Sequence, residues 1–149
     1  MKNLNTLFIA IAFFTGSAVM AQTQPAKPAQ FAAYAERINC TEAQLNALIN
    51  LAENSTAVLT LSGGFEFRGV VQSSVQKYAN LKTAIIRSTN FPGATLSLSL
   101  RTDANNQAQF VGRILSFQHN DVYELQWDNG VYVFQKKKFD NLVHTCNRQ

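Results

Sequence analysis

The sequence lacks the short signatures that mark most enzyme active sites. It contains no Gly-x-Ser-x-Gly, no His-Glu-x-x-His and no glycine-rich phosphate loop. Histidine occurs only 2 times, and neither histidine lies within a motif. The sequence therefore predicts no catalytic residue, no metal ligand and no cofactor site, and it favours a protein that is not an enzyme.

Long apolar runs are also scarce. The run near the N-terminus, Leu7–Phe14, is far shorter than the ~20 residues that a membrane-spanning helix needs. Lys2 precedes this run, and small or apolar residues precede Gln22, which is the layout of a cleaved secretory signal. We therefore expect residues 1–21 to be a signal peptide, the mature chain to be periplasmic or secreted, and no stable membrane span to remain.

Only 2 cysteines are present, Cys40 and Cys146. Neither belongs to a Cys-x-x-Cys pair or a recognisable catalytic signature. An even count in a chain sent to an oxidising compartment favours a structural disulfide. Cys40 and Cys146 are thus predicted to form a bridge that would stabilise the fold by ~2–4 kcal/mol.

The formal net charge is modest, +4 for the 149 residues. A nucleic-acid-binding protein usually concentrates more positive charge on one face, so no nucleic-acid partner is expected. The densest cationic stretch is Lys136, Lys137 and Lys138, which with Arg101 is the candidate interaction patch. Lysines at a strand end also discourage unwanted sheet pairing, so the patch does not by itself demand an acidic partner.

The clearest structural signal is the stretch 121–139. Asn129-Gly130 is the dipeptide best suited to a type I′ hairpin turn, in which both central residues need a positive φ. Alternation then gives one apolar face, formed by Tyr123, Leu125, Trp127, Tyr132 and Phe134. A one-residue slip would turn this aromatic face toward water, so the register is strongly specified and Trp127 is expected to be buried.

The N-terminal part predicts helices. Residues 22–30 are rich in proline and polar residues, which is typical of a flexible linker. Residues 31–38 repeat apolar side chains at helical spacing. A second helix begins after Thr41, whose side chain can form a capping box with Gln44, and it runs toward Asn54. Its apolar stripe consists of Leu45, Leu48, Ile49 and Ala52.

From Ala57 onward the apolar period changes from about 3.6 to 2, which indicates strands. A three-residue loop at 62–64 places Leu59 opposite Phe67, and the residues 91–94 suit a type II turn. Residues 73–79 are expected to be a loop, and 139–146 could be either strand or helical turn. The predicted strands are 58–62, 65–72, 81–88, 95–101, 109–118 and the two strands of the 121–139 hairpin.

The predicted fold class is α+β. N-terminal helices should pack on a mostly antiparallel meander of about seven strands, forming a rolled sheet or a small barrel. One domain, 31–149, should follow the linker. Aromatic residues at period 2 are usually core, although they could instead line a ligand pocket. They are Phe65, Phe67, Phe110, Phe117, Tyr123, Trp127, Tyr132 and Phe134.

The favoured function is a non-catalytic exported binding module with a protein or cell-envelope partner, inhibitors of secreted enzymes included. One alternative is a carrier whose barrel interior holds an apolar ligand. The other is a small hydrolase or metal enzyme using His119 with Asp121, or His144 with Asp140, since each pair could provide a base and its orienting carboxylate.

Overall fold

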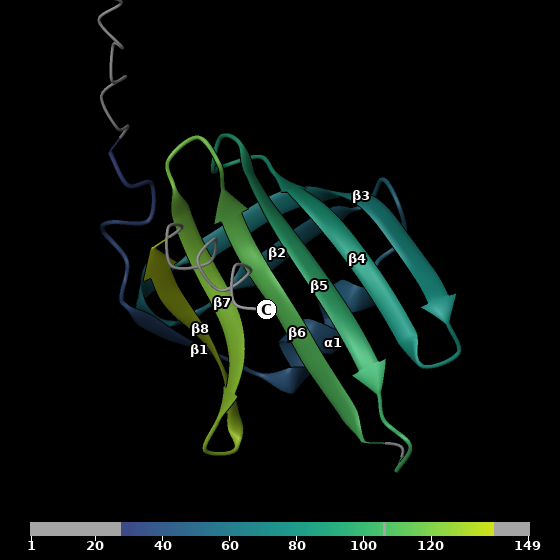
Figure 1. Cartoon of the computed structure of the whole chain (residues 1–149). Helices are drawn as coiled ribbons and strands as arrows, with labels where there is room; N and C mark the ends of the chain where they lie inside the picture. The colour runs from purple at the N-terminus through teal and green to yellow at the C-terminus, as the bar shows by residue number, and fades with distance from the viewer. Residues whose placement is uncertain (1–27, 106, 139–149) are drawn as a thin grey trace, which may run out of the picture.

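Seven of the eight strands follow one another in chain order around a single antiparallel sheet. The computed structural model describes residues 28–105 and 107–138. Figure 1 shows this sheet curled into a half-barrel, with one helix behind it. The elements are β1 (Arg37–Cys40), α1 (Glu42–Ile49), β2 (Thr56–Thr60), η1 (Ser62–Gly64), β3 (Glu66–Tyr78), β4 (Leu81–Ser88), β5 (Ala94–Thr102), β6 (Ala108–Ser116), β7 (Asp121–Asp128) and β8 (Val131–Lys138).

The sheet order is β1-β8-β7-β6-β5-β4-β3-β2, so the predicted antiparallel meander of seven strands is confirmed and β1 is an added strand. β1 and β2 are the two edges and do not pair with each other, which leaves the half-barrel open. The predicted α+β class is confirmed only in part. The described residues contain one α-helix, and the fold is mostly β.

The predicted helix at 31–38 is wrong. Residues 28–36 instead form a non-helical segment, here called the N-terminal strap, and residues from Arg37 onward form β1 on the free edge of β8. An isolated helix of this length is only marginally stable in water, whereas pairing with the edge strand β8 gives the backbone of residues 37–40 hydrogen-bond partners. The apolar residues of the predicted helix still pack into the core, although the backbone is not helical: Phe31 and Ile38 are buried and Tyr34 is half-buried.

The second predicted helix is confirmed as α1, with a shorter end. The side chain of Thr41 accepts a hydrogen bond from Gln44 N, and the Gln44 side chain bonds back to the Thr41 backbone. Leu45, Leu48 and Ile49 form its buried stripe. The helix stops at Ile49 with Asn50 as its C-cap, before the predicted Asn54.

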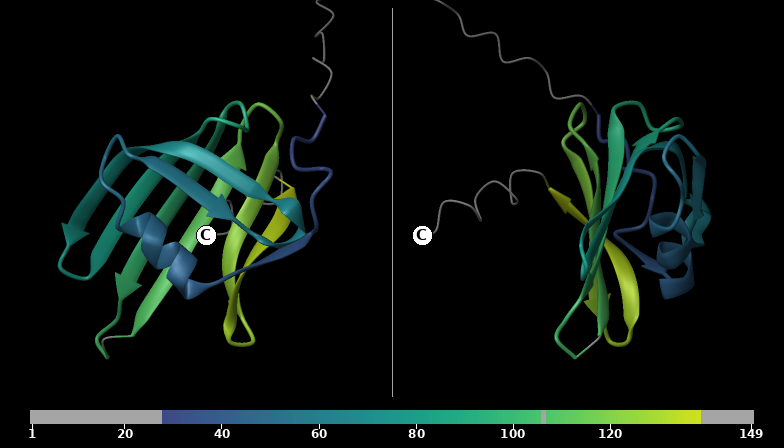
Figure 2. Two further views of the ribbon diagram at one scale, coloured as in Figure 1. Left: turned by 180° about the vertical axis from the view of Figure 1, so that it is seen from behind. Right: turned by 90° about the vertical axis from the view of Figure 1, so that its right-hand side faces the viewer.

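β3 is longer than predicted, because residues 73–78 are strand rather than loop. A register shift between Val71 and Ser73 marks a bulge, and bulges bend and twist a strand without ending it. Figure 2 shows the result: the first part of β3 runs with β2 across the back, and the second part turns into the front sheet beside β4. The bulge thus allows one strand to contribute to both the back and the front of the curled sheet.

The two predicted hairpin loops are confirmed. Leu59 pairs with Phe67 across the 62–64 loop, where Gly63 and Gly64 have positive φ. In the β7–β8 hairpin, Asp128 pairs with Val131 as predicted, and Asn129 and Gly130 have φ of 50° and 86°. These positive φ values are those of the expected type I′ turn.

The core lies on the concave face, between the sheet, α1 and the N-terminal strap. Phe31 meets Phe91 at a ring-centroid distance of 5.3 Å, and Phe65 stacks on Phe91 at 5.4 Å. This aromatic cluster fills the interior of the half-barrel. Most of the predicted aromatic core is confirmed, namely Phe65, Phe67, Phe110, Tyr123, Tyr132 and Phe134. Two predicted members are not in the core, since Phe117 is 66% exposed and Trp127 is 54% exposed.

The N-terminal strap is held on the sheet by side chains of β7 and β8. Phe31 N donates to Asp121 Oδ2 at 2.8 Å, and the Tyr123 hydroxyl donates to Ala35 O at 2.6 Å. The Lys136 ammonium donates to Tyr34 O at 2.7 Å. Each bond satisfies a backbone group that lies outside the ladders, so the strap is part of the fold.

Candidate ligand-binding hollow around Trp127

The hollow begins where two hairpins separate. β6 pairs with β7 only from Gly112↔Leu125 to Ser116↔Asp121. Beyond that point β6 continues to pair with β5 as far as Ala108, and β7 continues to pair with β8 as far as Asp128. Figure 1 shows the β5–β6 and β7–β8 hairpins diverging toward their free ends. The sheet is therefore split at this edge.

Tyr132 partly fills the split. Its hydroxyl accepts a hydrogen bond from Phe110 N at 3.0 Å, and this backbone N–H lies in the part of β6 that has left β7. Its ring meets Phe110 edge-on at 5.7 Å. Tyr132 is nearly fully buried. The tyrosine thus replaces a missing ladder bond and fixes the distance between the two hairpins.

Trp127 lies over Tyr132, opposite it in the β7–β8 register. The two rings are 4.7 Å apart at an interplanar angle of 62°. Trp127 belongs to the concave apolar face, as predicted, but 54% of its surface is exposed, so its predicted burial is wrong. The start of α1 lies beside the tip of the β7–β8 hairpin, where Glu42 lines the same hollow as Gly130, but it leaves the indole open to solvent.

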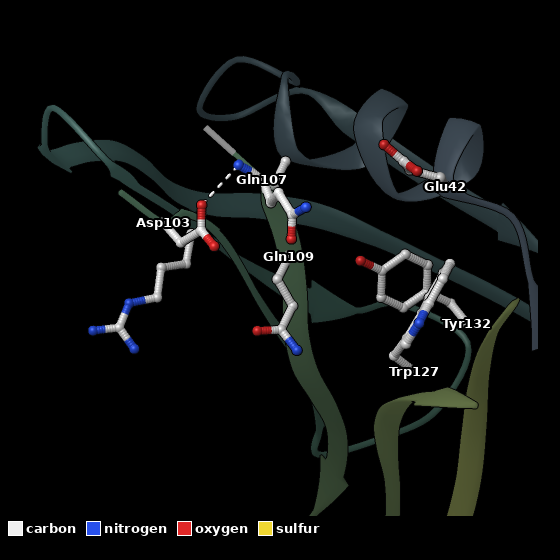
Figure 3. A pocket seen from close by; sticks show the side chains of 8 residues that line it. Glu42, Asp103, Gln107, Gln109, Trp127 and Tyr132 are labelled. Atoms are coloured by element: carbon white, nitrogen blue, oxygen red, sulfur yellow. Dashed lines mark hydrogen bonds between the residues drawn. The ribbon is translucent and has the colours of Figure 1, made fainter. Parts of the chain in front are cut away.

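The hollow beside Trp127 has a volume of about 470 Å³. Figure 3 shows Trp127 and Tyr132 on one side, Asp103, Gln107 and Gln109 on another, and Glu42 on the helix above. Its lining combines one exposed indole with carboxylate, amide and guanidinium groups: Glu42, Arg101, Asp103, Gln107, Ala108, Gln109, Trp127 and Tyr132. This volume lies within the ~300–1,000 Å³ of ordinary small-molecule sites.

The loop between β5 and β6 is organised by Asp103. Its Oδ1 accepts from Asn105 N and Gln107 N, both at 2.8 Å. Asp103 N also donates to Gln107 O at 3.0 Å. These bonds place Gln107 next to Asp103 on one side of the hollow, and β6 places Gln109 there.

A second, more apolar hollow of about 410 Å³ also has Trp127 in its lining. Glu42, Trp127 and Tyr132 line both hollows. The remaining lining residues are Asn39, Cys40, Thr41, Gly130 and Val131. Trp127 thus borders both a polar and an apolar compartment of one surface, here called the Trp127 site.

Cys40 is buried, and burial raises the pKa of its thiol to about 12. A protonated thiol is a poor nucleophile, so Cys40 has the character of a structural residue. No disulfide is present among the described residues. The predicted partner Cys146 lies outside them, so the Cys40–Cys146 bridge stays a prediction.

The candidate cationic patch is not gathered on one face. Lys136 belongs to the inner face, where its ammonium lies 3.2 Å from Glu36 and 5.8 Å from the centre of the Tyr123 ring. Lys137 pairs with Val122 on the outer face. Lys138 ends β8, and Arg101 lies at the opposite end of the sheet, in the lining of the Trp127 site.

His119 and Asp121 both hold the N-terminal strap. His119 Nδ1 donates to Pro28 O at 2.7 Å, and Asp121 is a buried acceptor for Phe31 N. The pair therefore has a structural task that the sequence did not reveal. The other candidate pair, His144 with Asp140, lies outside the described residues.

Among the described residues, no group of three or more His, Cys, Asp or Glu side chains is placed to hold a metal ion. None of the helices in that part of the chain is long and apolar enough to cross a bilayer. Comparisons with protein-family models, with curated proteins and with solved structures found no match for this chain.

Sequence reasoning missed the polar half of the Trp127 site. Glu42 in α1 is distant in sequence from Asp103, Gln107 and Gln109, and only the curl of the sheet brings α1 close to the β5–β6 loop. One signal was available. Trp127 lies two residues before the Asn129-Gly130 turn, near the end of its hairpin, where a concave face is least covered by other elements.

Proposed function

We propose that this protein is a non-catalytic exported binding module whose ligand contacts the Trp127 site. The observation that carries the proposal is the exposure of Trp127. The other aromatic side chains on the concave face of β6, β7 and β8 are buried, whereas the exposed indole of Trp127 lines both hollows beside the buried ring of Tyr132. Large exposed aromatic side chains beside a preformed hollow are typical of recognition surfaces.

The filled interior supports a binding surface over an enclosed carrier site. The aromatic cluster of Phe31, Phe65 and Phe91 occupies the space where an apolar ligand would lie. The roles of His119 and Asp121 as anchors of the strap likewise favour binding over hydrolysis. Export remains an expectation from residues 1–21, which lie outside the described part of the chain.

The test uses Trp127 as its own reporter, because it is the only tryptophan in the chain. Envelope and culture-medium fractions of the source organism, separated into polysaccharide, protein and lipid, are titrated while indole fluorescence is recorded. We expect one fraction to shift the emission, and mass spectrometry should recover its ligand chemically unchanged. A ligand that is converted during incubation would contradict the non-catalytic assignment.

The matched variants are Trp127→Ala and Tyr78→Ala, because Tyr78 is an exposed aromatic residue on a different hairpin. Trp127→Ala should weaken binding by about tenfold or more, measured by calorimetry. It should cost only ~1–2 kcal/mol in stability, because it loses one aromatic pair and partial burial. A buried tryptophan would cost ~3–5 kcal/mol. A loss of binding in both variants would show that the effect is not specific to this site.

A further inference from the structure

We infer that the ligand of the Trp127 site is a neutral oligosaccharide, bound with one sugar ring against the indole. This inference rests on the proposed function, because it names the ligand class of the same site. It follows from the kind of groups that surround Trp127, from their charge, and from the hydrogen bond that the Phe110 N–H already donates to the Tyr132 hydroxyl.

The indole is a rigid apolar platform. Trp127 is fixed by its contact with Tyr132, and Tyr132 is in turn fixed by Phe110 through both ring and hydroxyl. Little conformational entropy is therefore lost when a ligand settles on the indole. A pyranose ring presents C–H groups on its flat faces and hydroxyl groups around its rim, so it can pack on an aromatic face while its rim stays polar.

The groups around the platform match such a rim. A hydroxyl both donates and accepts hydrogen bonds, and the lining provides both capacities. Gln107 and Gln109 contribute amides, which donate and accept; Arg101 donates, and Glu42 accepts. Asp103 uses Oδ1 for its own loop, and no bond within the described residues uses its Oδ2.

The charge of the lining favours a neutral ligand. Glu42 and Asp103 bring two carboxylates, and Arg101 brings the one guanidinium of this lining. An acidic sugar would meet more like charge than opposite charge, and this imbalance disfavours it even though the exposed groups are partly screened by solvent. A neutral sugar meets no such penalty and can bond to both kinds of group.

The alternative that the split sheet invites is an extended peptide added to β6. Strand addition relies on main-chain hydrogen bonds along a free edge. Here the Phe110 N–H, which lies on that edge, already bonds to the Tyr132 hydroxyl. A peptide strand would have to break this bond before it could pair, which favours a ligand recognised by side chains.

The apolar compartment indicates a ligand of more than one ring. The two hollows, of about 470 and 410 Å³, share Trp127, Tyr132 and Glu42, so a chain of sugar rings can extend from one to the other. The Trp127 indole would then contact the ring that bridges them. Single sugars should bind much more weakly than oligomers.

The experiment titrates the full-length mature protein with cellotetraose, chitotetraose and tetragalacturonate, each followed by indole fluorescence and calorimetry. A neutral tetrasaccharide should shift the emission, and tetragalacturonate should bind at least about tenfold more weakly, a factor equal to ~1.4 kcal/mol. Trp127→Ala should weaken binding by about tenfold or more. Gln109→Ala, an exposed position that the fold tolerates, should weaken it by about threefold to tenfold. Tyr78→Ala should leave it unchanged.

Three results would overturn the inference. The first is that no neutral tetrasaccharide binds while a protein or lipid fraction still shifts the Trp127 emission, in which case the proposed binding function stands without its saccharide ligand. The second is that an extended decapeptide binds at Trp127 more tightly than either neutral sugar. The third is that Gln109→Ala, folded by circular dichroism, binds both neutral sugars as the wild type does. If no fraction and no sugar perturbs Trp127, both the inference and the proposed function are wrong.

Discussion

Tyr123 is the residue on which the anchoring of the strap converges. Its ring is fully buried against Phe31 and Phe65, and its hydroxyl donates to Ala35 O. Burial, and then the nearby negative charges of Glu36 and Asp121, raise the pKa of Tyr123 to about 12. The phenol therefore stays neutral in the folded state at a pH where it would ionise in the unfolded chain.

This shift predicts a loss of stability in alkali. Between pH 10 and pH 12 the folded state keeps a proton that the unfolded state releases, so the free energy of unfolding should fall as the pH rises. The fall should be on the order of 2–3 kcal/mol, at ~1.4 kcal/mol per pKa unit. Urea denaturation at pH 9, 10, 11 and 12 measures it.

The control for this prediction is Tyr123→Phe, which keeps the ring and removes the ionisable group. Its overall stability should be lower at pH 9, because Ala35 O loses its donor, but its alkaline slope should be shallower than that of the wild type. An unchanged slope would mean that other groups govern the alkaline transition.

The face on which a side chain lies could be predicted from sequence, but its exposure could not. Alternation assigned Tyr123, Leu125 and Trp127 correctly to the concave side. Burial also depends on what covers that side. The strap covers Tyr123, whereas Trp127 near the hairpin tip stays exposed although the start of α1 lines the same hollow. That difference depends on contacts between residues far apart in the chain, which a local pattern cannot contain.

At the scale of elements, the N-terminal strap anchors β1 to the sheet and is not a flexible linker. Residues 28–30, predicted to be part of a flexible linker, already make contacts: Gln30 Nε2 donates to Pro92 O and Pro28 O accepts from His119. The aromatic ring of Phe31 then enters the core. These contacts of the strap hold the N-terminal end of β1 against the sheet.

Removal of the Phe31 ring should therefore destabilise the whole domain. Phe31→Ala is expected to cost ~3–5 kcal/mol, as large-to-small core substitutions do. The matched control is Ala33→Ser in the same strap, where the side chain is exposed and the change should stay within about 0.5 kcal/mol. Urea unfolding followed by far-UV circular dichroism gives both values. Equal stability of the two variants would mean that the strap is not a structural part of the domain.

The strap and the β3 bulge are the elements that sequence patterns misjudged, and for related reasons. In the strap, apolar residues recur at helical spacing because a tight turn follows Phe31, with Tyr34 N bonded to Phe31 O. In β3, the bulge near Gln72 interrupts the alternation, which made the second half of the strand resemble a loop. In contrast, Asn129-Gly130 and the Thr41–Gln44 capping box were predicted correctly because their chemistry is local.

At the scale of the whole molecule, the topology separates local from distant pairing. β2 to β8 each pair with their neighbour in sequence, whereas β1 pairs with β8 across most of the domain. Contacts between distant segments close larger loops and form late in folding. The meander should therefore form first and β1 should dock onto it.

This order predicts different kinetic effects for two buried residues. Ile38→Ala, in β1, should mainly raise the unfolding rate and leave the folding rate within about twofold of the wild type. Leu98→Ala, in the central strand β5, should slow folding as well, because its neighbours pair early. Stopped-flow chevron plots of both variants measure these rates. A folding rate slowed more by Ile38→Ala than by Leu98→Ala would reverse the proposed order.

The pairing of β1 with β8 also has a consequence for biosynthesis. A ribosome makes the first strand long before its partner, so the sheet cannot be completed until the last hairpin has emerged. During that interval Phe31 and Ile38 have no core to enter. Under the proposed export, this delay would keep the chain unfolded for longer before it crosses a membrane. The strand synthesised first is the last to find its partner.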